Sequence, residues 1–387
     1  MKLLYVKNMA SKSISSFERS AFIAARKAGL DITFACNTNN IDPQKMEQDC
    51  ITYGVKLVHI DFERSPFSFK NIKAYKQLLT LMLQNNYDIV HCNTPMGGVV
   101  GRLAAHKANI PYVIYQAHGF HFWKGAPLFN WLCYYPVERL LAHYTDLLIT
   151  INQEDYQAAQ KFAAKKVILI NGVGIDISLF TPSTDKNPAL RKKLGIKQDA
   201  FVLLSVGELN KNKNHRIIFK ALHKLKNPFL YCVICGTGPL EDEYKQLIKK
   251  YGIEKQVYFT GFIQDIKQYY QMADALINPS LREGLPAVIM EAMGCKIPVL
   301  ASRIRGHLDL LPKSQFLFNP YNTNEIAKCI QSVLNNYPTQ EIELNFKQLE
   351  KFSFKEIISV MSNLYVSINL KNLQLLSKTY FLNVGKL

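Results

Sequence analysis

The sequence predicts an α/β protein built from two doubly wound, Rossmann-like parallel-sheet domains, and two observations lead to this fold class. Short continuous apolar runs alternate with amphipathic segments along nearly the whole chain, as expected for strands that helices bury on both faces of a parallel sheet. The chain has 387 residues, which is too many for one ordinary hydrophobic core but suits two domains of about 170–200 residues each.

The first half of the chain carries one set of alternating elements. Short apolar runs predict strands at 3–6, 32–35, 57–60, 89–92, 112–115, 147–151 and 167–170. Apolar residues three and four positions apart predict helices at 15–28, 72–84, 99–107 and 128–143.

The second half repeats the pattern. Strands are expected at 201–206, 230–235, 257–260, 275–278, 299–302 and 316–318, and helices at 215–225, 240–250, 266–272 and 324–334. A turn at 171–174 precedes a loop rich in proline and charge at 181–191, and we place the domain boundary there. The expected parts are an N-terminal domain at 1–172, a C-terminal domain at 173–370 and an extension at 371–387.

The charge of the chain limits its partners. The formal net charge of +17 is spread over both halves rather than gathered in a tail. Proteins that bind nucleic acid usually concentrate basic residues on one face, so we expect no nucleic-acid partner. The excess instead suits an anionic small substrate and peripheral contact with an anionic membrane.

The cysteines and the hydropathy indicate a cytoplasmic protein. Eight cysteines lack the spacing of a disulfide framework, which suggests a reducing compartment. Cys232 and Cys235 lie on an expected strand and face opposite sides, so no metal site is expected. No signal peptide is evident, and no apolar run reaches the ~20 residues of a membrane span.

The most informative segment is 275–302, which is expected to form a strand, an acidic loop, a short helix and a second strand. Pro286 stands where a helix begins and Gly294 where it ends. A helix start beyond the carboxyl end of a parallel strand attracts an anion through its free N–H groups. Glu283 and Glu291 flank this point, and carboxylates accept hydrogen bonds from sugar hydroxyls. The segment therefore predicts a site for a nucleotide-sugar.

The same segment resembles the signature of the retaining glycosyltransferases of family 4, which have the GT-B fold. The matching residues are Ser280, Glu283, Gly284, Leu285, Pro286, Glu291, Ala292, Met293, Pro298 and Val299. The resemblance implies a nucleoside-diphosphate-sugar donor, a final helix at 354–370 that crosses back to the first domain, and no metal or other cofactor. Lys296 departs from the family, which often has glycine there.

A second donor loop is expected after strand 201–206. Gly207 ends that strand, where glycine lets the backbone approach a ligand closely. Lys213 precedes the next helix, and a lysine is a compact charge for a phosphate. The family has Gly-Arg-Leu and then a lysine here, and Lys213 falls on the lysine position. Glu208 replaces the arginine, so Lys211 or Arg282 is a candidate substitute cation.

Two further donor contacts are implied by the resemblance. Gly236 belongs to a Gly-x-Gly-Pro turn like the one that lies near the donor in the family. Phe262 follows Gly261 at a strand end, where the family packs backbone against the nucleobase. A core aromatic is an equally good interpretation of Phe262.

The acceptor side is expected in the first domain. His118 stands at the carboxyl end of a strand, beside Gly119, where ligands of open α/β sheets bind. In the family this histidine contacts the donor sugar, whereas His121 reads as structural. The loop 120–127 holds aromatics beside a lysine, which suits a membrane interface or a lipid-linked acceptor.

The helix that follows this loop is expected to belong to the core. Leu128, Trp131, Leu132 and Tyr135 fall on one helical face, as core-facing residues of an amphipathic helix do.

The expected activity is retaining, metal-independent sugar transfer from a nucleoside-diphosphate-sugar, UDP-linked, to a lipid-linked glycan of an extracellular or capsular polysaccharide, at the cytoplasmic face of the plasma membrane. His118, Lys213 and Glu283 are the candidate catalytic residues, and Glu291 is expected to hold the ribose. A nucleotide-sugar epimerase of the same fold and a non-catalytic partner subunit remain alternatives. A nicotinamide dehydrogenase would need G-x-G-x-x-G after the first strand, and the chain has no glycine there.

Overall fold

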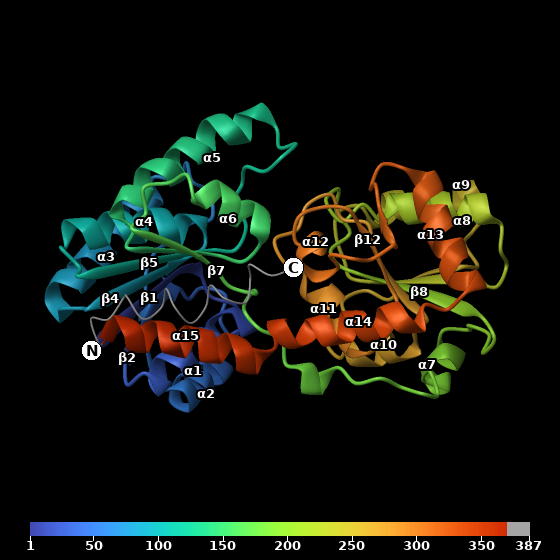
Figure 1. The fold of residues 1–387 in the computed structure, drawn as a ribbon, viewed down its shortest axis with the longest axis horizontal. Helices are drawn as coiled ribbons and strands as arrows, with labels where there is room; N and C mark the ends of the chain where they lie inside the picture. The colour runs from blue at the N-terminus through green and yellow to red at the C-terminus, as the bar shows by residue number, and fades with distance from the viewer. Residues whose placement is uncertain (370–387) are drawn as a thin grey trace. The chain divides into compact units, whose positions relative to one another are not determined.

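The computed structural model describes residues 1–369, which form two compact units (Figure 1). Unit 1 comprises Met1–Gly174 together with the segment that begins at Phe354, and unit 2 comprises Ile175–Ser353. The predicted extension at 371–387 lies outside the described residues.

Unit 1 is built on a seven-stranded parallel sheet with the order β3-β2-β1-β4-β5-β6-β7. The strands are β1 (Lys2–Met9), β2 (Asp31–Asn37), β3 (Val55–His59), β4 (Ile89–Asn93), β5 (Tyr112–Ala117), β6 (Leu147–Thr150) and β7 (Lys166–Leu169). The chain winds outward from β1 in one direction and from β4 in the other. The carboxyl ends of β1 and β4 are therefore the topological switch point, where open α/β sheets bind ligands.

Helices and one 3₁₀ turn surround this sheet. They are α1 (Ser16–Lys27), α2 (Pro43–Tyr53), α3 (Lys70–Asn85), α4 (Pro95–Lys107), α5 (Leu128–Leu141), η1 (Ala142–Tyr144), α6 (Gln153–Ala159) and α15 (Phe354–Asn369). The last helix, α15, lies alongside α1 (Figure 1). The Tyr365 hydroxyl lies 2.7 Å from Nδ1 of the buried His91 on β4, so the end of the described chain is fastened into the core of unit 1.

Unit 2 is a smaller doubly wound domain. Its six-stranded parallel sheet has the order β10-β9-β8-β11-β12-β13. The strands are β8 (Phe201–Val206), β9 (Leu230–Cys235), β10 (Val257–Phe259), β11 (Ala275–Asn278), β12 (Val299–Ser302) and β13 (Leu317–Phe318). Its switch point lies between β8 and β11, the two strands that lead into the predicted donor loops.

The helices of unit 2 are mostly short. They are η2 (Ile177–Leu179), α7 (Pro188–Lys193), α8 (Arg216–Leu225), α9 (Glu241–Tyr251), α10 (Lys267–Met272), α11 (Ala287–Gly294), α12 (His307–Leu310), α13 (Thr323–Asn335), α14 (Thr339–Leu349) and η3 (Glu350–Phe352).

The predicted fold class is confirmed, because both sheets are parallel and doubly wound and the last helix returns to unit 1. Each predicted strand is present, with small shifts in its bounds. Helices α2, α6, α7, α12 and α14 were not predicted. Three of them span at most seven residues, and α2 and α14 bury few side chains, so their apolar periodicity is weak.

Candidate active site

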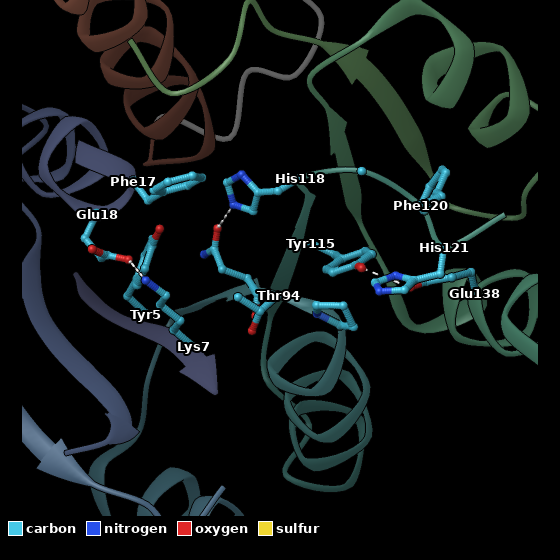
Figure 2. A pocket seen from close by; sticks show the side chains of 13 residues that line it. Tyr5, Lys7, Phe17, Glu18, Thr94, Tyr115, His118, Phe120, His121 and Glu138 are labelled. Atoms are coloured by element: carbon cyan, nitrogen blue, oxygen red, sulfur yellow. Dashed lines mark hydrogen bonds and ion pairs between the residues drawn. The ribbon is translucent and has the colours of Figure 1, made fainter. Parts of the chain in front are cut away.

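A cavity of about 300 Å³ opens at the switch point of the unit 1 sheet (Figure 2). Lys7 of β1, Asn93 of β4 and the β5 loop residue His118 line it. A concave site with a few convergent polar groups is the usual form of a small-molecule pocket. His118 therefore lies in a pocket, as its place after β5 predicts. His121 lines the same pocket.

The His118 imidazole is held in its neutral form, in which Nε2 donates a hydrogen bond and Nδ1 can accept one. Its Nε2 lies 3.0 Å from Oδ1 of Asn93, and because an amide oxygen only accepts, Nε2 carries the proton. Burial, followed by the nearby charge of Lys7, lowers the pKa of His118 from 6.5 to about 4. Nδ1 is buried and has no hydrogen-bond partner within residues 1–369. The ring of Phe17 meets the imidazole edge-on at 5.2 Å between centroids (Figure 2).

An ion pair between Lys7 and Glu18 closes one side of the pocket (Figure 2). Glu18 is buried and also accepts a hydrogen bond of 2.9 Å from the Ser15 backbone N–H, which makes it the third residue of a capping box at the start of α1. Sequence reasoning missed this pair. The spacing from Ser15 to Glu18 is a visible capping signal, but nothing in the sequence pairs Glu18 with Lys7.

The opposite wall of the pocket includes Glu138 of α5. Its carboxylate lies 2.7 Å from a terminal nitrogen of the fully buried Arg102 and accepts a hydrogen bond of 2.9 Å from the Tyr115 hydroxyl. The Arg102 guanidinium also lies 3.9 Å from the centroid of the Tyr115 ring. The inner side of α5 is thus fixed to α4 and β5.

The aromatic loop before α5 differs from the expectation. Phe120 and Phe122 are buried in the core of unit 1, so the prediction of an exposed aromatic loop at 120–127 is wrong for these two rings. The core prediction is wrong for Leu128, Trp131 and Leu132, which are exposed. Apolar residues recur all around this helix, so periodicity alone did not reveal which side is buried.

In unit 2 the two predicted donor loops meet. Nζ of Lys213, in the loop after β8, lies 2.7 Å from Oε1 of Glu283, in the loop after β11. The two side chains are 21% and 15% exposed. Strands β8 and β11 are neighbours in the sheet, which explains why residues 70 positions apart in sequence come together.

Two glycines let the backbone close around Lys213. A Cβ on Gly236 would lie 2.0 Å from the carbonyl oxygen of Gly207, and the φ of Gly236 is 147°. A Cβ on Gly207 would lie 3.1 Å from the Lys213 side chain. A larger residue at position 236 would force the loops apart, whereas one at position 207 would displace the Lys213 side chain and strain the backbone, whose φ is 152° there.

The acidic loop is held by backbone contacts. Asn212 donates a hydrogen bond of 3.0 Å to the Arg282 carbonyl, and a Cβ on Gly306 would lie 2.2 Å from the Gly284 oxygen. Pro286 caps α11, and Ala287 is its first residue, so the predicted start is one position early. Leu285 packs against the core of unit 2. Because α11 begins here, its first N–H groups lie next to the loop that carries Glu283.

The half-buried Glu291 carboxylate accepts a hydrogen bond from the buried Tyr270. The Tyr270 hydroxyl lies 2.7 Å from its Oε2, and burial raises the pKa of the Glu291 carboxyl while Tyr270 lowers it. Phe262 is 79% exposed, so its interpretation as a core aromatic is wrong.

Glu208 and Lys296, which depart from the family signature, make local contacts, and the buried Arg305 contacts the acidic loop. Glu208 is exposed and accepts a hydrogen bond of 2.9 Å from the Asn210 side chain. Arg305, which sequence reasoning missed, is buried and donates to the Glu283 carbonyl at 3.3 Å. Lys296 has a φ of 53°, a conformation that glycine adopts most easily, and its ammonium pairs with Glu343 at 2.8 Å.

Within residues 1–369, no group of three or more His, Cys, Asp or Glu side chains is arranged to hold a metal ion. Within the same residues, no helix is long and apolar enough to cross a membrane.

Comparison with known proteins places the chain in a family. Residues 186–348 match the family model described as glycosyl transferases group 1, and residues 2–152 match the model described as glycosyl transferase 4-like. The putative glycosyltransferase EpsD of Bacillus subtilis (strain 168) is 43% identical over 271 residues, which cover 68% of this chain and 71% of EpsD. The chain therefore belongs to the group 1 glycosyl transferases.

A second relative of this glycosyltransferase has a named reaction. It is the UDP-Gal:alpha-D-GlcNAc-diphosphoundecaprenol alpha-1,3-galactosyltransferase of Escherichia coli, 30% identical over 272 residues, which cover 68% of this chain and 70% of the relative.

Solved structures agree on the fold of this glycosyltransferase. Anabaena HepE, crystallised with UDP, has a TM-score of 0.76 at 22% identity, covering 95% of this chain and 100% of HepE. The expected GT-B fold is confirmed.

Proposed function

We propose that this glycosyltransferase moves a sugar from a UDP-sugar to a hydroxyl of a lipid-linked glycan, with retention of the anomeric configuration and without a bound metal, in the synthesis of an extracellular or capsular polysaccharide. The named reaction of the E. coli relative supports a UDP-linked donor and a lipid-diphosphate acceptor. The resemblance of the 280–299 segment to the retaining family supports the stereochemistry.

The observation that carries the proposal is the 2.7 Å contact between Lys213 and Glu283 at the switch point of the unit 2 sheet. A cation and a carboxylate at this edge match the two ends of a sugar diphosphate. Lys213, with the first N–H groups of α11 near Gly284 and Pro286, would stabilise the charge that builds on the departing diphosphate. Glu283, once released from Lys213, would accept hydrogen bonds from the donor sugar.

Other predicted residues take supporting roles in this proposal. Glu291 would hold the ribose hydroxyls with its carboxylate kept in place by Tyr270. Phe262 would offer an exposed ring to the nucleobase. His118 would orient the sugar and the acceptor hydroxyl through its neutral ring.

The proposed reaction needs no side chain to act as a general base. The bond from the anomeric carbon to the acceptor oxygen forms on the face that the diphosphate leaves, and the electron pair of the broken bond stays on the diphosphate. The acceptor proton passes to a diphosphate oxygen. The side chains of the site would then contribute by positioning the reactants and by stabilising the charge on the departing diphosphate.

A transfer assay tests the proposal. Purified protein is incubated with labelled UDP-galactose, UDP-glucose or UDP-N-acetylglucosamine, with and without a lipid-diphosphate-linked saccharide, in the presence and absence of EDTA. We expect UDP release and labelled lipid only with the acceptor, unchanged by EDTA, and NMR of the product to show the donor's anomeric configuration.

The variants Lys213→Ala and Glu283→Ala should each lower turnover by at least tenfold, while Lys220→Ala, an exposed lysine on α8, should not change it. An altered sugar nucleotide without any acceptor would identify an epimerase instead. Binding of UDP-sugar with no turnover for any acceptor would point to a non-catalytic subunit. Full activity in both site variants would contradict the residue assignment.

A further inference from the structure

An exposed apolar stripe runs along α5. Leu128, Phe129, Leu132 and Leu140 are 73%, 58%, 67% and 62% exposed. At 3.6 residues per turn these side chains, with the exposed Pro136, lie on one side of the helix. A large exposed apolar patch on a folded domain marks an interaction surface, and α5 lies at the margin of unit 1 (Figure 1).

The charge on the stripe itself is basic, while the loop before the helix carries Lys124 beside Glu154, whose carboxylate accepts a hydrogen bond of 2.7 Å from the Lys124 backbone N–H. Arg139 is exposed between the stripe leucines, and Lys124 is exposed in the loop before the helix. Lys107 is exposed at the end of α4, and its neighbour His106 stacks on Tyr144, just beyond α5, at 4.1 Å between ring centroids. The acidic residue of α5, Glu138, lies on the other side of the helix and is paired with Arg102.

The inner side of the same helix faces the unit 1 pocket. Glu138 lines the pocket, and Trp131 and Tyr135 pack against the buried Phe122 at 5.4 and 5.2 Å between ring centroids. These contacts fix which side of the helix turns inward and leave the apolar stripe facing away from the pocket. A helix is about 10–12 Å thick with its side chains, so only that thickness separates the stripe from the pocket.

We propose that the stripe of α5 docks on an anionic lipid bilayer and so places the unit 1 pocket within reach of a lipid-linked acceptor. Helices with leucine and phenylalanine on one face and basic residues beside it lie in the membrane interface. The part that concerns the acceptor rests on the proposed function, whereas the docking surface does not.

A bilayer fits this surface better than a second copy of the chain. In a two-fold interface centred on α5, Arg139 would approach its own copy, and two like charges would be desolvated together. At a membrane the same arginine meets anionic headgroups. Each basic residue near such a surface strengthens binding by roughly fivefold.

The test is co-sedimentation of the full-length protein with vesicles of phosphatidylcholine alone or mixed with phosphatidylglycerol and cardiolipin. We expect binding to the anionic vesicles that falls with added salt. Leu132→Glu and Leu140→Glu should each reduce binding at least tenfold, and Arg139→Ala roughly fivefold. The matched control is Leu344→Glu on α14 of unit 2, which replaces a leucine that is also exposed, and it should bind as the wild type does.

Equal binding by the stripe variants and the control overturns the proposal. So does a dimer in vesicle-free solution that Leu132→Glu converts to a monomer, because the stripe would then be an interface between copies. Tryptophan fluorescence, which reports unit 1, and far-UV circular dichroism of every variant verify that each is folded. Vesicle binding without sugar transfer would refute the proposed function and leave the docking surface standing.

Discussion

Replacing Lys213 with alanine should lower the free energy of unfolding of unit 2 as well as the rate of sugar transfer. The Lys213 ammonium lies 2.7 Å from the Glu283 carboxylate, with the side chains 21% and 15% exposed. Exposed ion pairs contribute about 0–1 kcal/mol, and breaking a fully buried pair costs about 3–5 kcal/mol. A pair of intermediate burial should therefore cost about 1–3 kcal/mol when the lysine is removed.

The double variant Lys213→Ala/Glu283→Ala separates stability from function. Removing both charges leaves no carboxylate partly buried without its partner, so most of the lost stability should return. Activity should not return, because both groups are proposed to act on the donor. The cycle therefore predicts opposite outcomes for the free energy of unfolding and for turnover.

Denaturant unfolding followed by two probes gives the measurement. Both tryptophans, Trp123 and Trp131, belong to unit 1, so tryptophan fluorescence reports that unit while far-UV circular dichroism reports both. In Lys213→Ala the unfolding transition should shift to lower denaturant when followed by dichroism and should not shift when followed by fluorescence. In Lys220→Ala neither transition should shift. An unshifted dichroism transition in Lys213→Ala would mean that the ion pair does not form in solution. Wild-type turnover in the double variant would refute the site.

Three further outcomes are expected. Gly236→Ala should weaken UDP binding at least tenfold by calorimetry, because the new Cβ would lie 2.0 Å from the Gly207 oxygen; unchanged affinity would refute this account of the loop. His118 binds its proton at a pKa of about 4 in the folded protein and 6.5 unfolded, so its contribution to stability is lost as pH falls from about 6.5 to 4, by up to about 1.4 kcal/mol per pH unit. In His118→Gln the free energy of unfolding, followed by tryptophan fluorescence, should fall less steeply with decreasing pH by that amount. The same slope in the wild type and the variant would contradict this prediction. Tyr270→Phe removes the hydrogen bond that lowers the pKa of Glu291, so UDP affinity should fall severalfold and more at pH 6 than at pH 8; a loss independent of pH would count against the role of Glu291.

The fold was predictable because buried parallel strands leave a strong record in sequence. Runs such as Leu203–Leu204 and Leu276–Ile277 are apolar throughout, since helices cover both faces of the sheet. Polar helices leave a weaker record. Along α2 only Met46 is buried, so the sequence of this helix carries almost no apolar periodicity to detect.

The meeting of the unit 2 loops was largely predictable because their residues follow strand ends. Gly207 and Gly236 directly follow strands, and Lys213 and Glu283 lie in the loops after β8 and β11. Parallel topology brings such positions to one edge of the sheet. Partners outside those loops were not predictable. Arg305 reaches the Glu283 carbonyl from the segment after β12, and neither its spacing nor its local sequence indicates that contact.

The core face of α5 was predicted correctly for Tyr135 and wrongly for Leu128, Trp131 and Leu132, for a physical reason. A helix with leucine and aromatic residues on several sides satisfies a core pattern and a membrane pattern equally. The deciding contact is the one between Glu138 and the buried Arg102, because it fixes which side turns inward. That contact joins residues 36 positions apart, so only tertiary structure reveals it.

The ion pairs of the two units differ in how readily a ligand can replace the contact between their charges. In unit 1 the Glu18 carboxylate also binds the Ser15 backbone, and the Glu138 carboxylate also binds the Tyr115 hydroxyl. Within residues 1–369, the Glu283 carboxylate hydrogen-bonds only to the Lys213 ammonium. A ligand that offers a phosphate to the cation and hydroxyls to the carboxylate can replace that single contact on both sides, which leaves neither charge unpaired. The carboxylates of the unit 1 pairs each have a second partner within unit 1, so a ligand cannot replace all of their contacts in one exchange. We therefore expect the unit 1 pairs to shape the pocket and the Lys213–Glu283 pair to open when donor binds.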